Sequence, residues 1–251
     1  MNILSLFVLI PLLMLLGLWL SRNLNQVRGV MVAGSSLLLL TAIYLTVDYL
    51  GLRQAELAQG VEPAEMLYTY SVMWYAPLHI CYSIGVDGIS VAMLLLSGII
   101  VFTGTFASWK LKPLTKEYFL WFTLLSLGVF GFFISTDLFT MFMFYEVALI
   151  PMYLLIGVWG SGRKEYAAMK LTLMLMGASA FLLIGILGIY YGAGAQTMNV
   201  IKIAQLHNIP MDMQRIFFPL TFLCFYIIAA HLFKRMLALS DKHSVDSRIF
   251  C

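Results

Sequence analysis

Long apolar runs separated by short polar segments dominate the chain. Runs of about 20 apolar residues are long enough to cross the hydrocarbon core of a bilayer as helices. Seven segments meet this description: residues 3–20, 29–50, 89–109, 118–135, 138–158, 166–191 and 216–237. The pattern therefore predicts an all-α fold, a polytopic transmembrane bundle of about seven spans that forms a single domain.

The polar segments between these runs are short, with one exception. Residues 51–85 form the longest connection and carry three glutamates and several aromatic residues, which indicates an external loop. Only Ser135-Thr136-Asp137 separates the fourth run from the fifth, so these two spans form a tight hairpin. Asp137 can cap the fifth helix and Asp87 the third, because an aspartate side chain accepts hydrogen bonds from the first amides of a helix. Residues 238–251 follow the last span as a polar tail.

Composition narrows the class of protein. The chain is 62% hydrophobic and 11% charged, whereas a soluble domain is about 45–50% apolar and about 25% charged. The three cysteines are scattered, which predicts neither a disulfide framework nor a metal site. No glycine-rich nucleotide-binding motif is present, and only His231 lies within a predicted span. We therefore expect a lipid bilayer as surroundings, no nucleic-acid partner, and no redox cofactor bound in this chain.

The distribution of lysine and arginine predicts the orientation of the bundle. Eleven of the fifteen basic residues fall in the segments after the first, third, fifth and seventh spans, and three fall on the opposite side. Cytoplasmic loops carry the excess of basic residues. The split predicts an N-terminus outside and a C-terminus in the cytoplasm, in a multi-pass protein of a bacterial-type inner membrane.

Glu146 is the first candidate for chemistry. It lies nine residues after Asp137, which is roughly 13–14 Å along a helix and close to the bilayer midplane. Ionisable groups at that depth are costly and typical of ion or proton pathways. Pro151 follows five residues later and removes the N–H that would bond the carbonyl of Val147. The pattern favours a polar, hydrated path beside Glu146; the alternative is a structural carboxyl that is bonded to a neighbouring helix.

Two lysines could act with this glutamate. Lys170 lies early in the sixth span, where it belongs either to the path or to the membrane surface as an interfacial anchor. Its predicted depth differs from that of Glu146 by about 12 Å, so water and not a direct ion pair would link the two. Lys234 lies late in the seventh span, three residues after His231, and composition alone favours an interfacial anchor.

The segments STDLFTMFMFYEVALIPMYLLIGVWG (135–160) and RKEYAAMKLTLMLMGASAFLLIGI (163–186), with SIGVDGIS (83–90), resemble one family. It is the chain M, or chain 4, family of the proton-pumping NADH-quinone oxidoreductase, complex I. The resemblance covers roughly residues 1–225. It implies that Glu146 matches the family's proton-channel glutamate and that Lys170 matches the lysine that opens the sixth helix. Asp137 and Asp87 match conserved acidic positions.

The resemblance also implies an activity and partners. The chain is expected to be a proton-translocating membrane subunit of the respiratory chain, coupling NADH oxidation and quinone reduction to proton transport. The enzyme activity belongs to the complex, and the NAD, FMN, Fe–S and quinone sites are expected in other subunits. Those membrane subunits are the expected partners.

Two departures from the family affect this reading. The proline-rich break of the family's seventh helix is replaced by AAHLFKRMLALSDKH, so Lys234 does not align cleanly with the channel lysine. Family members have about 14 spans in two inverted halves, so the chain is expected to be a copy truncated to its N-terminal half. Two alternatives stay open: a subunit of a multi-subunit sodium/proton antiporter, and a degenerate half-bundle that transports nothing.

Overall fold

The computed structural model places most of the predicted spans. The described residues are 3–58, 66–75, 80–109, 111, 114–160, 162, 164–192, 198–205, 215–217, 219 and 222. A short 3₁₀ turn, Ile3–Ser5, leads into six long helices within these residues: α1 (Leu6–Leu20), α2 (Leu24–Ala58), α3 (Gly88–Ala107), α4 (Thr115–Ile134), α5 (Leu138–Trp159) and α6 (Lys164–Gly192). All six are long and apolar enough to cross a membrane. The short helix α7 (Val200–Gln205) follows.

The predicted spans agree with these helices to within a few residues, except at α2. The second span was expected to end at residue 50, but α2 continues to Ala58. This extra length occupies the first part of the predicted external loop. The seventh predicted span, residues 216–237, lies almost entirely outside the described residues, as does the tail 238–251, so both stay predictions.

The external loop also contains a β-hairpin that the all-α prediction omits. Strands β1 (Leu67–Tyr75) and β2 (Ile80–Val86) pair in antiparallel fashion, with Val72 opposite Tyr82 and Leu67 opposite Val86. β1 is largely exposed, whereas most of β2 is buried. Aromatic and β-branched residues dominate both strands, and such residues favour a half-buried pleated surface. The fold is therefore a helical membrane bundle with a small sheet at one end.

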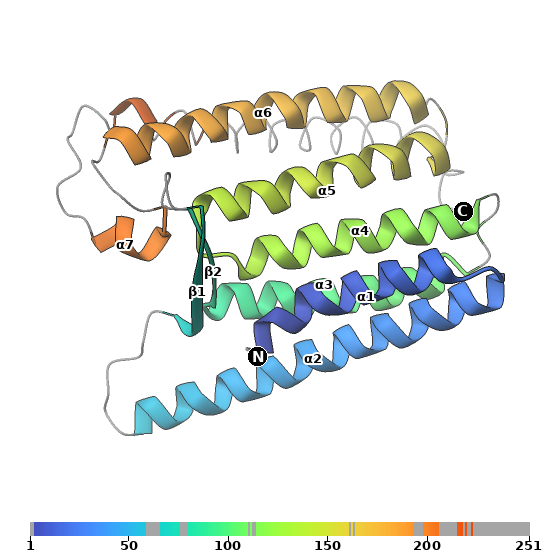
Figure 1. The fold of residues 1–251 in the computed structure, drawn as a ribbon, viewed down its shortest axis with the longest axis horizontal. Coiled ribbons are helices and arrows are strands. Elements are labelled where there is room, and N and C mark those ends of the chain that lie inside the picture. Colours follow the sequence, from blue (N-terminus) through green and yellow to red (C-terminus); the bar gives the residue numbers. More distant parts are fainter. Residues whose placement is uncertain are drawn as a thin grey trace, which may run out of the picture. The chain divides into compact units, whose positions relative to one another are not determined.

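The contacts divide the chain into two compact units, one comprising residues 1–168 and 196–205 and the other comprising residues 169–195 and 206–251. In the first unit, α1 to α5 run side by side (Figure 1). Within it α4 contacts α1, α3 and α5, and α2 contacts α1 and α3. Buried side chains fill the centre, and Phe7 of α1 meets Phe130 of α4 with ring centroids 5.5 Å apart. Helix α4 is thus the element against which α5 is placed.

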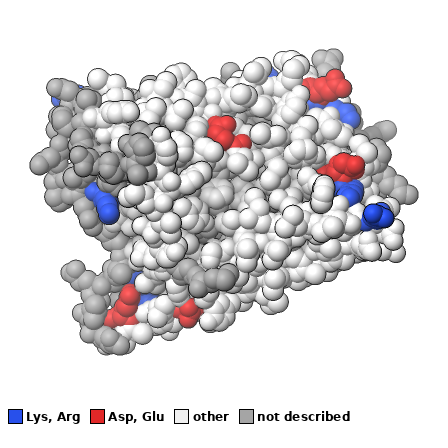
Figure 2. Space-filling view, viewed as in Figure 1, with Lys and Arg blue, Asp and Glu red and all other residues white. Residues whose placement is uncertain are grey.

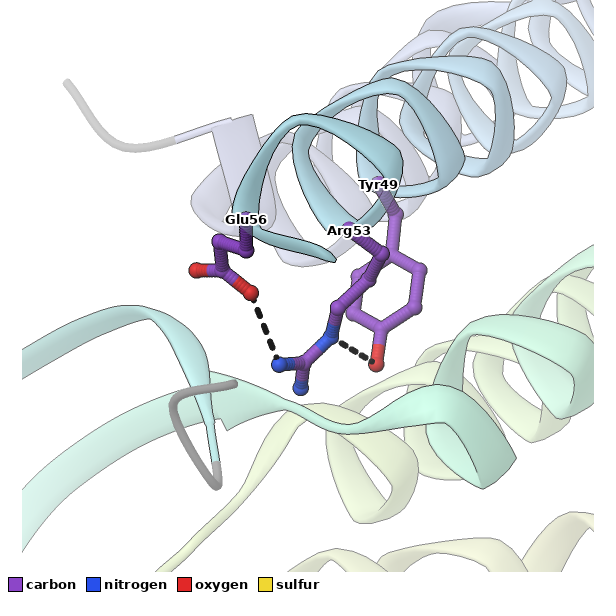
Figure 3. Close-up of polar contacts among 3 residues, drawn as sticks. All are labelled: Tyr49, Arg53 and Glu56. Carbon is purple, nitrogen blue, oxygen red and sulfur yellow. Dashed lines mark hydrogen bonds and ion pairs between the residues drawn. The ribbon is translucent and has the colours of Figure 1, made fainter. Parts of the chain in front are cut away.

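Polar side chains near the end of α2 bond to one another and to the hairpin. Arg53 donates to the hydroxyl of Tyr49 and to the carboxylate of Glu56, both at 3.0 Å (Figure 3). Earlier in the helix, Asp48 accepts a hydrogen bond from the hydroxyl of Tyr68 in β1. Burial and this hydrogen bond raise the pKa of Tyr68 to about 12. The Asp48–Tyr68 contact fixes the hairpin to α2.

Candidate functional site

Glu146 lies in the first half of α5. It lies eight positions after Leu138 and thirteen positions before Trp159, which places it about 12 Å from one end of the helix and about 20 Å from the other. Its Oε1 atom is buried and has no hydrogen-bond partner among the described residues. A buried polar atom without a partner costs free energy unless water or an ion satisfies it. The oxygen is therefore available to a proton or to a water molecule.

Pro151 supplies a second polar defect near Glu146. It lies inside α5 and is buried. Proline has no N–H, so the carbonyl of Val147, four residues earlier, cannot make its helical hydrogen bond. This carbonyl belongs to the residue next to Glu146. At membrane depth such backbone groups persist only where protein or cavity water satisfies them. The Oε1 atom of Glu146 therefore lies next to the residue whose helical carbonyl bond Pro151 removes.

Two glycines of α4 let α5 approach closely at this turn. A Cβ atom at Gly128 would lie 2.8 Å from the Cβ of Ala148 and 2.9 Å from the carbonyl oxygen of Phe144. A Cβ atom at Gly131 would lie 2.2 Å from the ring of Phe144. Phe144 and Ala148 precede and follow Glu146 by two residues each. Small residues at membrane helix contacts permit such approach, so α4 fixes the position of the helical turn that carries Glu146.

Asp137 caps α5, as predicted, and lies in a turn that three segments hold together. Its Oδ2 accepts from the backbone N–H and the hydroxyl of Thr140, both at 3.3 Å. On one side of the turn, the N–H of Thr136 donates to the carbonyl of Ser83 in β2 at 2.9 Å. On the other side, the N–H of Leu138 donates to the carbonyl of Met198 at 3.0 Å. The β-hairpin and the segment before α7 therefore clamp the turn between α4 and α5.

The environment of Asp137 is unusual for a cap. The residue is 0% exposed, and its Oδ1 atom has no hydrogen-bond partner among the described residues. The hydroxyl of Ser83, whose carbonyl bonds this turn, is likewise buried without a described partner. Burial raises the pKa of the Asp137 carboxyl, and hydrogen bonds from Thr140 oppose that effect. Asp87, by contrast, is an ordinary cap that accepts from the N–H of Ser90 at 2.8 Å.

The two candidate lysines fall elsewhere in the chain. Lys170 lies six residues after the start of α6, in the second unit, and is exposed. Its predicted separation from Glu146 stays a prediction. Lys234 and His231 lie outside the described residues. Within the described part of the chain, no group of three or more His, Cys, Asp or Glu residues could hold a metal ion.

Sequence reasoning missed the residues that position the two carboxylates. Ser83 and Thr140 bond the Asp137 turn, and Gly128 and Gly131 seat α5. The glycines are three residues apart, a spacing that places them on one helix face, and this spacing is the pattern that could have identified the contact. Nothing in the sequence of the external loop marks Ser83, because its role depends on strand pairing.

These features define a class: multi-pass membrane proteins with acidic groups along one helix. Solved structures share the fold. Respiratory complex I from Thermus thermophilus matches with a TM-score of 0.72 at 21% identity, covering 89% of this chain and 42% of that one. The membrane-bound sulfane sulfur reductase, an archaeal respiratory membrane complex, matches with a TM-score of 0.68 at 20% identity, covering 88% of this chain and 43% of that one.

Sequence comparison shows which proteins this chain is similar to. Residues 135–240 match the transmembrane family described as NADH:quinone oxidoreductase/Mrp antiporter. The chloroplastic NAD(P)H-quinone oxidoreductase chain 4 of Pelargonium hortorum is 36% identical over 174 residues, which are 68% of this chain and 34% of that protein. A chain 4 of a Picosynechococcus strain is 33% identical over 154 residues, 61% of this chain and 28% of that protein. Over the matched residues the chain is similar to the chain 4 proteins of this family, and it spans about a third of the length of these curated relatives.

Proposed function

We propose that the chain is a proton-translocating membrane subunit of a respiratory NADH-quinone oxidoreductase. The observation that carries the proposal is Glu146, whose buried Oε1 lacks a described partner beside the Pro151 defect. The names of the curated relatives support the kind of complex. In this proposal the chain enters that enzyme as a subunit, its partners are the other membrane subunits, and the NAD, FMN, Fe–S and quinone sites belong to those partners.

Glu146 holds the transported proton in this proposal. Desolvation favours the neutral carboxyl and a nearby cation favours the carboxylate. A conformational step that changes the balance between these two effects therefore loads or releases the proton. Lys170 is proposed as the cation, acting through water. Lys234, outside the described residues, is retained as a second cationic candidate on the basis of its charge in the predicted seventh span.

Asp137 is proposed as the group at the other end of the path. It is buried and lies about 12–14 Å from Glu146 along α5. That distance is too long for one direct transfer, so water would have to bridge it. The N-terminal end of α5 faces the outside in the proposed orientation, with the N-terminus of the chain outside and the C-terminus in the cytoplasm of a bacterial-type inner membrane. Asp137 would then be the last carboxyl before release.

NADH-driven proton uptake by inverted membrane vesicles tests this function. We expect vesicles from a strain that lacks the gene to take up fewer protons per NADH oxidised, and expression of the gene to restore the ratio. A strain that keeps the full ratio without the gene contradicts the proposal. NADH-quinone reductase activity is measured in the same vesicles, because a fall in both activities together indicates loss of the whole complex.

A sodium/proton antiporter subunit is the second candidate, because the description of the matching family includes Mrp antiporters. The two functions differ in their energy source. An antiporter subunit would exchange sodium for protons in vesicles energised without NADH, and a tagged chain would purify without NADH-oxidising subunits. A complex I subunit would purify with them and would show no sodium-dependent exchange.

A further inference from the structure

A hollow between the end of α1 and the start of α4 combines basic residues with membrane-facing apolar surface. It has a volume of about 380 Å³ and is lined by Trp19, Leu20, Ser21, Arg22 and Lys116. These residues lie where α1 ends and α4 begins. Figure 2 shows basic and acidic side chains together at this end of the helices and a predominantly uncharged surface between the two ends. The hollow therefore lies at the level at which lipid headgroups meet a spanning helix.

Lys116 lines the hollow and is held in place by the end of α1. Its ammonium group donates to the carbonyl oxygens of Trp19 at 3.2 Å and of Ser21 at 2.7 Å. These contacts tie the start of α4 to the last carbonyls of α1, and a lysine at that position complements the negative end of the helix dipole. An ammonium group has three donors, so one N–H is left to point away from the two carbonyls. No carboxylate pairs with Lys116 within the described residues.

Arg22 contributes a second positive charge. Its residue is exposed, and its guanidinium group makes no ion pair within the described part of the chain. Arg28 differs, because it donates to the carbonyl of Trp109 at 2.9 Å and lies 5.0 Å from the centroid of that indole ring. Glu117 follows Lys116 but does not line the hollow. The lining thus has two positive charges and no negative charge.

An apolar strip of α1 leads away from the hollow along the membrane-facing surface. Leu13 is 57% exposed, Leu16 57% and Leu20 70%. Their spacing of three and four residues puts them on one face of the helix. Trp19, 73% exposed, lies beside them, and tryptophan is enriched at the headgroup level of membranes. A ligand that suits both parts has an anionic head and apolar chains.

We infer that this hollow binds the headgroup of an anionic phospholipid, with Arg22 and Lys116 contacting the phosphate and the α1 strip contacting the acyl chains. The inference is independent of proton transport, because none of these residues belongs to the α5 site. Each basic residue near an anionic membrane surface contributes about fivefold in affinity, so both together contribute about thirtyfold.

Retained lipid, measured by native mass spectrometry of the purified protein, tests the site. The protein, in its complex if it purifies as one, is equilibrated with equal amounts of dioleoylphosphatidylglycerol and dioleoylphosphatidylcholine. We expect the wild type to retain the anionic lipid preferentially. Arg22→Gln should lower the ratio of anionic to zwitterionic lipid about fivefold, and Arg22→Lys should preserve most of it.

Lys116→Gln should lower the ratio by a similar factor, and the double variant about thirtyfold. Lys164→Gln is the matched control, because Lys164 also donates to a helix-end carbonyl, that of Val158 at 2.6 Å, and does not line the hollow. Circular dichroism checks the fold of each variant; if Lys116→Gln does not fold, Arg22→Gln decides. An unchanged ratio in folded Arg22→Gln overturns the inference, as does a wild type without preference, or displacement of the lipid by inorganic phosphate alone.

Discussion

Replacing Gly128 by alanine should push α5 away from α4 at the turn that carries Glu146. The new Cβ would lie 2.8 Å from the Cβ of Ala148, whereas carbon atoms in contact are about 3.5–4.0 Å apart. Relief requires a local separation of about 1 Å, because the opposing atoms are a Cβ and a backbone oxygen that no rotamer change can move. Over-packing of this kind typically costs about 1–3 kcal/mol.

Helix propensity opposes this cost, since alanine exceeds glycine by up to about 1 kcal/mol within a helix. Gly51→Ala is the matched control, because a Cβ there meets nothing within 4 Å. The assay is unfolding in mixed micelles with increasing denaturing detergent. We expect Gly128→Ala to be less stable than Gly51→Ala by about 1–3 kcal/mol. Equal stability, or a more stable Gly128→Ala protein, would refute the close approach of α4 and α5.

Two further predictions concern the sheet and the Asp137 turn. Tyr68→Phe removes the hydroxyl that donates to Asp48 and should lower the free energy of unfolding by about 1 kcal/mol. Tyr70→Phe is the control, because Tyr70 lies on the same strand and is exposed. It should cause no measurable change in the same assay. Because burial raises the folded-state pKa of Asp137 above that of the unfolded chain, ionisation favours unfolding; the thermal midpoint of the wild type should therefore fall as the pH rises through that pKa. Asp137→Asn should flatten this fall, and an equally steep fall in the variant would show that another group causes it.

The lengths of the hydrophobic runs predict most of the helices, because the thickness of the bilayer sets how long a spanning helix must be. A spanning segment must satisfy its backbone hydrogen bonds internally, so about 20 apolar residues in sequence become a helix. The boundaries of α3, α5 and α6 follow within two residues of the runs. The caps follow too, since Asp87 and Asp137 precede their helices directly. Outside the membrane this constraint disappears, and there the prediction missed the hairpin.

Part of the candidate site could likewise be predicted from the sequence, and part could not. Glu146 and Pro151 could be found from the sequence, because an ionisable residue and a proline are both unusual in an apolar spanning helix. The clamp on Asp137 could not, because the backbone groups of Ser83 and Met198 lie more than 50 residues from that turn in either direction of the sequence. Pairing across such separations depends on tertiary contacts that no local pattern encodes. The contact of Gly128 with Phe144 and Ala148 needs both helices to be in register.

Glu146 is proposed to carry the transported proton, and the Glu146→Gln variant tests this role. Glutamine keeps the shape and polarity of the side chain but cannot ionise. Proton uptake per NADH oxidised is measured in inverted vesicles from strains that carry the wild type, Glu146→Gln, Glu146→Asp or the exposed control Glu117→Gln, with assembly of the complex checked in each. We expect a large loss of proton uptake for Glu146→Gln, partial retention for Glu146→Asp and no change for Glu117→Gln. An assembled Glu146→Gln complex that pumps at the wild-type ratio would contradict this role.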